Sequence, residues 1–489
     1  MRHFPLLLAP ALVSGHSLLF AQAGIHYQQD FPPAEFRARW NQMLDKIGPE
    51  AVAVVQGAAL ANGFSLPRQN NEFYYLCGVE TPHSYLLLDG RSRKVMLYLP
   101  PRNARLEASE GKVLSAEDAE LALTLTGADQ VLSTDAMRNG DWLGSLSGGA
   151  PPLIYALFSP GEGNTQNRNE LQASNAAIAA DYWDGRLPRE AQFTGLLRAR
   201  YPRAQVADLT PVLDAMRSVK SPREIALIRR ASQIAGQGIL EAMKSTRAGL
   251  REYQLDAAAR YVFLVNGARL EGYRSITASG TANIWNAHYY RNRDELRSGD
   301  LILQDFAPEY GYYTSDVTRM WPVNGKFSPV QRELLGFVLE YRDAIIGRIR
   351  PGKTRVEIMA EAEAAMAPVI ARTRFSKPAY EQAARELITK GGGVFSHPVG
   401  MAVHDDGPYG NAPLRPGHVF SIDPQLRVPD ERLYIRYEDV VVVTETGVEN
   451  FTDFLVSDLD EIERVMKESA ASNSGIVQRF PPGGPKFRR

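Results

Sequence analysis

Apolar residues fall into short runs and into helically spaced sets along the chain, so both strands and helices are predicted. The runs 51–55 and 94–99 are apolar over most of their length and are typical of buried strands. Farther along, Ile225, Ile228 and Ala231 recur at helical spacing. The first 200 or so residues are therefore expected to alternate strands and helices, and further helices are expected to follow.

The helix that contains Ile225 has a clear start, and the same kind of start recurs later in the chain. Residues 221–224 read Ser-Pro-Arg-Glu and residues 328–331 read Ser-Pro-Val-Gln, which places serine at the cap, proline in the first turn and a capping-box partner three residues on. Arginine, a spacer and glycine follow each helix, at 247–249 and 350–352, before a second predicted helix. The repetition suggests two related halves, although good caps can also recur by chance.

A first pair of strands is predicted with one acid on each arm. The mixed apolar segment 301–306 ends near Asp305, Gly311 supplies a turn, and the segment 312–317 returns with Asp316. A carboxylate within an apolar strand is costly unless it is paired or bound to metal. This segment is therefore a candidate site.

A second pair of strands repeats the arrangement near the C-terminal end. The segments 419–423 and 434–443 are rich in valine, isoleucine and aromatic residues, and they carry Asp423 and Glu438. The same cost applies to these two buried acids.

These four acids and one histidine form a candidate metal-binding set. His397 follows the glycine-rich run 391–393. Hard divalent cations prefer oxygen ligands and a carboxylate can bridge two of them, so the set suits two Mn²⁺-like ions better than one tetrahedral zinc. Two-metal sites most often catalyse hydrolysis. Each acid taken alone could instead pair with an arginine, the candidates being Arg319, Arg427 and Arg436.

The segments around these residues resemble the metallopeptidase family of aminopeptidase P and prolidase, in both order and spacing. They are 305–319, 396–405, 422–424 and 436–439, together with 68–78 in the N-terminal half. The likeness covers nearly the whole mature chain. It implies an α/β (α+β) fold, with a creatinase-like N-terminal domain followed by a pita-bread metallopeptidase domain.

The resemblance also implies how the metal ligands divide. Asp305 would chelate one ion, His397 and Asp423 the other, and Asp316 and Glu438 would bridge both. The ions would most readily be Mn²⁺, with Zn²⁺ or Co²⁺ as alternatives. A hydroxide held between them would be the nucleophile.

Three further residues match family positions that face the substrate. His288 and His404 would flank it, steadying the scissile carbonyl or passing protons, whereas a lone histidine without this context is more often structural. Arg436, two positions before Glu438, would share a strand face with that ligand and orient it or the substrate. Asp423 would act in catalysis as well as in metal binding.

The chain departs from the family pattern at three positions. Asp423 stands where the family usually has glutamate, so the carboxylate is one methylene shorter. Gly393 stands where aminopeptidase P tends to carry histidine, and Arg427 where tyrosine is common. The last two positions fall near the pocket for the residue after the cut, so the proline preference is less secure than the metal chemistry.

Composition excludes a general affinity for nucleic acid. In 489 residues, Lys and Arg number 55 against 56 Asp and Glu, so the net charge is −1 and there is no global basic field. The only basic cluster is the short tail 485–489. Cys77 is the sole cysteine, which rules out an internal disulfide.

The first residues are predicted to form a targeting sequence. Arg2 and His3 precede the apolar run 4–13, and 21–23 fits a small-x-small cleavage site, so a secretory signal is favoured over a poorly cleaved anchor. A secreted or periplasmic protein without stable membrane insertion is expected. The predicted divisions are a signal peptide at 1–23, an aminopeptidase P-like N-terminal domain at 24–216, a catalytic domain at 217–470 and a disordered basic tail at 471–489.

The favoured function is an Xaa-Pro aminopeptidase, a dinuclear metallo-aminopeptidase that acts on peptides with proline in second position. Its nearest rival is a prolidase, which cuts only dipeptides. Another is a creatinase-like hydrolase without metal, against which the near-complete ligand set argues. A fourth possibility is a peptide-binding homologue weakened by Asp423. The resemblance also implies a homo-oligomer, dimer or tetramer, with the N-terminal domain closing the site or contacting subunits.

Overall fold

The computed structural model describes residues 27–61, 63–138, 141–391, 395–405, 407 and 411–468. The predicted signal peptide, the predicted tail and most of the glycine run 391–393 lie outside these residues. The chain packs as two units, one formed by Met1–Gly161 with Arg189–Thr210 and the other by Glu162–Pro188 with Pro211–Arg489. The domain boundary at 216 and 217 stays a prediction.

The first unit is built on a six-stranded mixed sheet in the order β4-β3-β2-β1-β5-β6. The predicted strands at 51–55 and 94–99 are confirmed as β1 and β3, and their apolar side chains lie in the interior. The strands are β1 Ala51–Gln56, β2 Tyr85–Asp89, β3 Lys94–Leu99, β4 Gln130–Ser133, β5 Leu153–Ala156 and β6 Gln205–Asp208. The helices are α2 Pro33–Ile47, α3 Asn71–Cys77, α4 Ala104–Glu110, α5 Ala119–Thr126 and α7 Arg189–Arg200.

Two helix pairs with matching starts frame the second unit, as the sequence predicts. Capping boxes at Ser221 and Ser328 open the first helix of each pair. Gly249 and Gly352, in the two connections, adopt φ of +85° and +82°, a conformation that suits glycine. The pairs are α9 Pro222–Ser245 with α10 Glu252–Val265, and α12 Pro329–Ile346 with α13 Arg355–Arg372. The other helices are α6 Arg168–Ala180, α8 Thr210–Arg217, α11 Gly280–Ile284, α14 Pro378–Lys390 and α15 Leu459–Val465.

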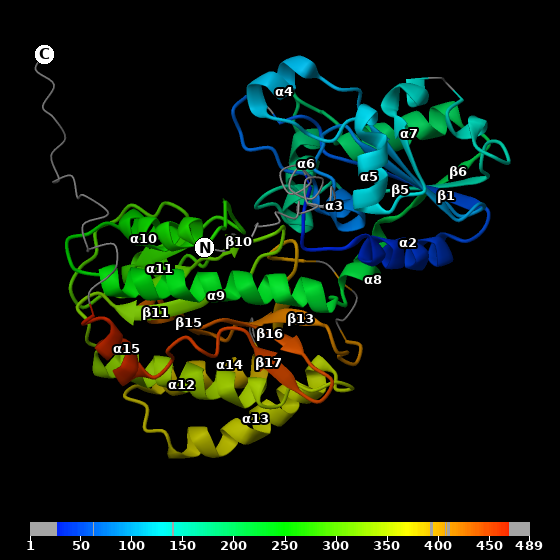
Figure 1. The fold of residues 1–489 in the computed structure, drawn as a ribbon. Coiled ribbons are helices and arrows are strands. Elements are labelled where there is room, and N and C mark those ends of the chain that lie inside the picture. Colours follow the sequence, from blue (N-terminus) through cyan, green and yellow to red (C-terminus); the bar gives the residue numbers. More distant parts are fainter. Residues whose placement is uncertain are drawn as a thin grey trace, which may run out of the picture. The chain divides into compact units, whose positions relative to one another are not determined.

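Antiparallel strands fill the space between the helix pairs. Strands β11, β13, β15 and β16 lie between α9 on one side and α12, α13 and α14 on the other (Figure 1). One sheet runs β11-β9-β8, another runs β12-β13-β16-β17, and β14 pairs with β15. Their bounds are β8 Ile276–Ser279, β9 Leu301–Asp305, β11 Thr318–Pro322, β12 Phe395–Pro398, β13 Val419–Ile422, β14 Gln425–Val428, β15 Leu433–Arg436, β16 Asp439–Val443 and β17 Val448–Asn450, with a short pair β7 Leu270–Glu271 and β10 Pro308–Glu309.

The first predicted hairpin exists, but its second arm is shifted. Strand β9 pairs with β11, and Asp305 lies opposite Thr318. The predicted strand 312–317 is wrong, because this segment turns, with Tyr312 at φ +71°. Asp316 therefore lies in the connection, two residues before β11.

The second predicted pair is also divided differently. The continuous strand expected at 434–443 is wrong, since β15 pairs with β14 in one ribbon and β16 pairs with β13 in another sheet. Tyr437 and Glu438 lie at the break. A glutamate in a break between strands can point its carboxylate where no regular strand would place it.

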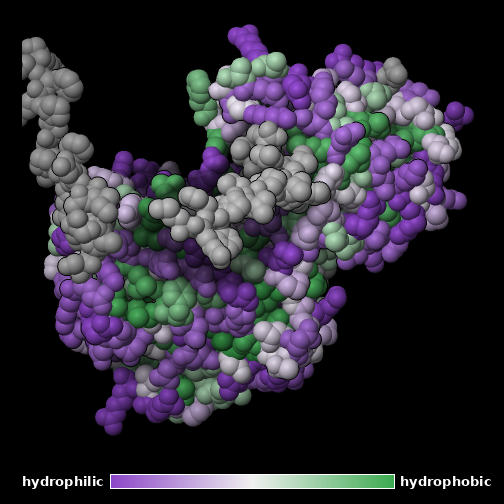
Figure 2. Space-filling model, viewed as in Figure 1, coloured by the Kyte–Doolittle hydropathy of each residue, from purple (hydrophilic) through white to green (hydrophobic). Residues whose placement is uncertain are grey.

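The surface carries the polar residues that the interior excludes. The face in Figure 2 is predominantly hydrophilic, with apolar patches interspersed. Among the helices of the described residues, none combines the length and the apolar character needed to cross a bilayer.

Candidate metal centre

Asp305 and Asp316, which come from the first of the two predicted halves of the second unit, lie at the end of β9 and just before β11. Asp305 is the last residue of β9, and the Tyr273 hydroxyl donates to its Oδ1 at 2.6 Å. Asp316 lies in the connection before β11. Asp305 is 2% exposed and Asp316 is 3% exposed, so both carboxylates are withdrawn from water.

The second half contributes the other three candidates. His397 lies in β12, Asp423 directly follows β13, and Glu438 lies between β15 and β16. Glu438 joins the two halves, because its backbone N–H donates to the Thr318 carbonyl at 3.1 Å. The Thr318 hydroxyl donates to Glu438 Oε2 at 2.8 Å. The structure thus brings all five predicted ligands to the place where the two halves of the second unit meet.

A buried ion pair fixes this junction. Arg319 Nη2 lies 2.6 Å from Asp439 Oδ1, with both side chains fully buried, and Arg319 Nη1 donates to the Glu438 carbonyl at 2.6 Å. Burial raises the pKa of Asp439, but Arg319 and Arg342 outweigh it and hold that pKa below its usual value. Arg319 therefore pairs with a neighbour of the candidate ligands and holds the backbone of Glu438.

Arg436 binds three of the four acids at once. Its Nη1 lies 2.8 Å from Asp305 Oδ2, its Nε 2.8 Å from Asp423 Oδ1, and its Nη2 2.5 Å from Glu438 Oε2. The predicted contact with Glu438 is present, although the two residues do not share a continuous strand. One guanidinium offsets one of four negative charges. Simple pairing with arginine therefore leaves most of the buried charge uncompensated.

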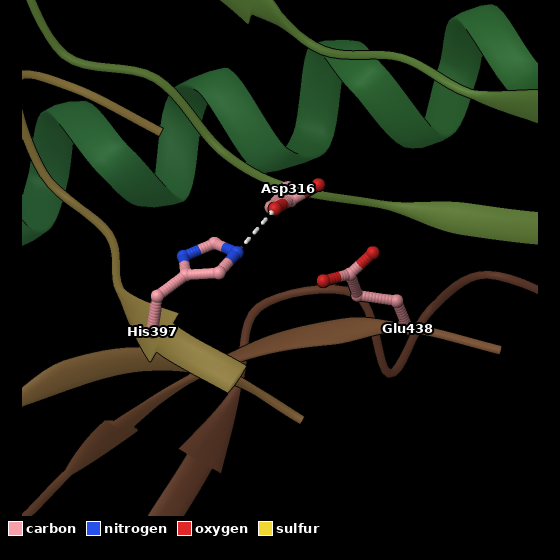
Figure 3. Close-up of side chains that lie close together, drawn as sticks. All are labelled: Asp316, His397 and Glu438. Atoms are coloured by element: carbon pink, nitrogen blue, oxygen red, sulfur yellow. Dashed lines mark ion pairs between the residues drawn. The ribbon is translucent and has the colours of Figure 1, made fainter. Parts of the chain in front are cut away.

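Asp316, His397 and Glu438 form the tightest group. Each offers a ligand atom within 4.8 Å of the others (Figure 3). His397 Nδ1 lies 3.1 Å from the Pro398 carbonyl, a contact in which the nitrogen donates. That tautomer leaves a lone pair on Nε2, which lies 3.2 Å from Asp316 Oδ2. Two acceptors at this distance require a proton or a metal cation between them.

The protonation states agree with a cation site. Burial, with His404 next in effect, lowers the pKa of His397 to about 3, so the imidazole is neutral at ordinary pH. Burial raises the pKa of Glu438 to about 8, and burial with the Glu438 charge raises that of Asp316 well above its usual value. Asp316 Oδ1 and Glu438 Oε1 are buried without a hydrogen-bond partner among the described residues. These oxygens fit divalent cations, which would relieve the repulsion.

The two predicted substrate-facing histidines differ in exposure. The ring of His404 lies 4.1 Å from that of His397 between centroids. Burial lowers the pKa of His404, and nearby His288 acts in the same direction. His288 is exposed. The backbone N–H of His404 donates to Asn167 Oδ1 at 3.0 Å, which ties this histidine to the segment before α6.

Sequence reasoning missed several residues that hold the site. The Gln425 amide donates to Asp423 Oδ2, and Tyr273 and Thr318 hold Asp305 and Glu438 as described. A signal for Gln425 was its position two residues after a predicted ligand. Asn167 and Tyr273 are distant in sequence from their partners, and only the folded chain shows those contacts.

Comparison with known proteins identifies this architecture. The profile of "Metallopeptidase family M24" matches residues 226–445, and that of "Aminopeptidase P, N-terminal domain" matches residues 36–140. The Xaa-Pro aminopeptidase of Escherichia coli is 30% identical over 455 residues, which cover 88% of this chain and 97% of that protein.

The chain belongs to the aminopeptidase P family of M24 metallopeptidases.

Solved structures of the aminopeptidase P family share the fold. Proline aminopeptidase P II from Yersinia pestis aligns with a TM-score of 0.71 at 30% identity, covering 89% of this chain and 99% of that one. Aminopeptidase P from E. coli with the inhibitor Pro-Leu aligns with a TM-score of 0.70 at 28% identity, covering 90% and 99%. The predicted fold class, an aminopeptidase P N-terminal domain followed by a pita-bread domain, is confirmed.

The metal-free protein should lose stability as pH rises from about 4.5 to about 8. The pKa of Glu438 is about 8 against an ordinary 4.5, so the folded state holds this proton more tightly than the unfolded state. The stabilisation is complete below the unfolded pKa and is lost as pH rises through the folded one. Thermal unfolding midpoints of metal-free protein across this interval measure the effect.

Glu438→Gln should flatten this dependence, whereas Glu445→Gln, at an exposed position, should leave it unchanged. Adding Mn²⁺ at pH 8 should raise the midpoint of the wild-type protein, because bound cations replace the lost protons. A metal-free midpoint that stays level or climbs with pH in this interval would contradict the assignment.

Proposed function

We propose that the protein is a metal-dependent Xaa-Pro aminopeptidase, which removes the first residue of a peptide whose second residue is proline. One observation carries the proposal: four buried carboxylates and a neutral imidazole converge, with two carboxylate oxygens unpartnered, in a chain of the aminopeptidase P family. Relatives of this chain named Xaa-Pro aminopeptidase support the bond specificity.

Two divalent cations fit the charge of the cage, that is, the cluster formed by Asp305, Asp316, His397, Asp423 and Glu438. In the proposal, Asp305 would hold one ion, His397 and Asp423 would hold the other, and Asp316 and Glu438 would serve both. Such ions would supply Lewis acidity and would lower the pKa of a water molecule, which would then act as the nucleophile. Manganese is the favoured metal. Zinc is a realistic alternative, since one neighbouring structure is a zinc-substituted E. coli aminopeptidase P with product.

The protein's own residues would position the peptide and move protons. Asp423 is fully buried, and burial raises its pKa above the usual value although Arg436 opposes this, so it can accept a proton from the attacking water while Gln425 holds its Oδ2. His404, neutral through burial, can donate a hydrogen bond to the oxygen that develops charge at the scissile carbonyl, and His288 can assist.

A bond to proline calls for a dedicated site. The proline nitrogen has no hydrogen, so a peptidase that relies on a hydrogen bond from that position loses a contact. Recognition must then come from the shape of the pocket and from groups beyond the bond. A homo-oligomeric assembly stays a prediction.

Metal removal should abolish hydrolysis of Xaa-Pro peptides, and Mn²⁺ should restore it. The reason is that the nucleophile and the charge stabilisation both depend on the ions. The measurement is the rate on Xaa-Pro-Gly, with Xaa-Ala-Gly as the control substrate, together with the metal content of the purified chain. Two ions per chain and release of only the first residue from Xaa-Pro-Gly are expected. Cleavage confined to dipeptides would favour a prolidase, and full activity in chelator would overturn the proposal.

Asp423→Asn should lower kcat by about 100-fold or more, because it removes both a ligand charge and a proton acceptor. Asp423→Glu should preserve or raise kcat if the shorter acid is only a tolerated variant. Asp430→Asn, at an exposed position in a nearby turn, is the matched control. Wild-type turnover in Asp423→Asn would place this residue outside the site, and a clear fall in Asp423→Glu would show a cavity built around aspartate.

We also propose that residues 1–23 act as a signal peptide and that the protein is secreted or periplasmic. Support comes from the apolar run 4–13 and the small residues at 21–23. The mature protein recovered from outside the cytoplasm should begin at Gly24 by N-terminal sequencing. Deletion of 4–13 should retain it inside the cell. An exported protein that keeps its first residues would favour an anchor.

A further inference from the structure

Arg427 lies on the face of the β14–β15 ribbon that carries site residues. It stands opposite Tyr434, and Gln425 stands opposite Arg436. Opposite residues of an antiparallel pair share a face, as do residues two apart on one strand. Gln425 and Arg436 both contact Asp423. Arg427 and Tyr434 are therefore the next pair along the same face.

Two aromatic rings hold the Arg427 guanidinium. Its central carbon lies 4.0 Å from the ring centroid of Tyr434 and 5.3 Å from that of Trp285. Within the described part of the chain, the Arg427 side chain makes no hydrogen bond and no ion pair, and its backbone pairs with β15. Stacking on aromatic faces fixes the plane of a guanidinium but leaves its N–H donors free at the edge. A half-buried cation with free donors suits an anionic ligand.

The Tyr434 hydroxyl supplies an independent second sign of a ligand. Tyr434 is 2% exposed, and its hydroxyl oxygen is buried without a hydrogen-bond partner among the described residues. A buried hydroxyl normally finds a partner, because leaving it unpaired is costly. Arg427 stacks on the ring that carries this hydroxyl, so the guanidinium and the unpaired hydroxyl belong to one stacked pair. An acceptor with negative charge, such as a carboxylate, satisfies both.

The position of this pair relative to Asp423 sets the length of the ligand. Residues two apart on a strand are separated by about 7 Å. Arg427 is one such step beyond Gln425, which contacts Asp423. An extended peptide advances about 3.5 Å per residue. A carboxylate at Arg427 would thus lie one or two residues beyond a bond cleaved at the metal cage.

We propose that Arg427 and Tyr434 form a subsite for a substrate carboxylate on the leaving side of the scissile bond. The proposal rests on the proposed peptidase function and specifies its substrate class: short Xaa-Pro peptides whose terminal carboxylate reaches Arg427. An acidic side chain at the same distance offers the same chemistry. Arg427 is then a specificity residue, which lowers KM for di- and tripeptides that end in a free acid.

The test compares free acids with amides of equal length. KM and kcat are measured for Xaa-Pro, Xaa-Pro-Gly, their C-terminal amides and Xaa-Pro-Asp-amide, in wild type, Arg427→Gln, Arg427→Lys and Tyr434→Phe. Arg198→Gln is the matched control, because Arg198 stacks on Phe158 at 5.2 Å in the first unit. A binding measurement by calorimetry with Pro-Gly and Pro-Gly-amide gives a readout that does not depend on turnover.

Wild type should favour free acids, and Arg427→Gln should raise their KM by about 10-fold or more while changing the amides less than about twofold, as expected for loss of a charge-assisted hydrogen bond. Arg427→Lys should recover part of the effect, Tyr434→Phe should show a smaller loss, and Arg198→Gln none. A preference for Xaa-Pro-Asp-amide over Xaa-Pro-Gly-amide would identify an acidic side chain as a second source of the carboxylate.

An acid-to-amide ratio that is the same in wild type and Arg427→Gln overturns the subsite and leaves the peptidase function standing. No cleavage of any Xaa-Pro peptide by metal-loaded wild type overturns the proposed function instead. If the substitution unfolds the protein, Arg427→Lys and Tyr434→Phe decide, since Arg427→Lys keeps the positive charge and Tyr434→Phe keeps the stacked ring.

Discussion

Four carboxylates lie buried close together in the second unit, and the residues around them reduce the free-energy cost of burying so much negative charge. Isolated buried charges cost many times more than any single hydrogen bond returns. Arg436 offsets part of the repulsion by binding Asp305, Asp423 and Glu438 together. The remaining imbalance falls on Asp316 and Glu438, whose pKa values rise in response. The cage is thus poised to take up cations.

Neither half of the unit could hold such a cage alone. Each half supplies acids at the ends or breaks of its strands, and the halves are locked by backbone contact between Thr318 and Glu438 and by the buried Arg319–Asp439 pair. Locking matters because ligands must be held within a few tenths of an ångström to favour the intended metal. The scaffold residues next to the ligands are therefore as much a part of the site as the ligands themselves.

Local signals in the sequence predicted the elements well and their long-range pairing less well. The capping boxes at Ser221 and Ser328 and the strands at 51–55 and 94–99 are visible in short windows because propensity and capping act locally. The run 434–443 looked like one strand because its residues favour strands throughout. Tertiary pairing divided it, since β15 and β16 hydrogen-bond to different partners.

The five candidate ligands could be assembled from the sequence only through a family resemblance, because they lie in separate segments. Their convergence is visible in the fold. Contacts such as Asn167 with His404 join positions over 200 residues apart, and no periodicity signals them.

The second unit is discontinuous along the chain, since Glu162–Pro188 belongs to it while Arg189–Thr210 returns to the first. Glu162 lies 2.7 Å from Arg217, which lies 2.5 Å from Asp405, the neighbour of His404. A gene fragment starting at Pro211 would thus encode an incomplete core, with Arg217 and His404 each deprived of a partner. Recombination that exchanges one of the two units must therefore carry both of its separate segments. The two units are for this reason less easily exchanged than units that are each continuous along the chain.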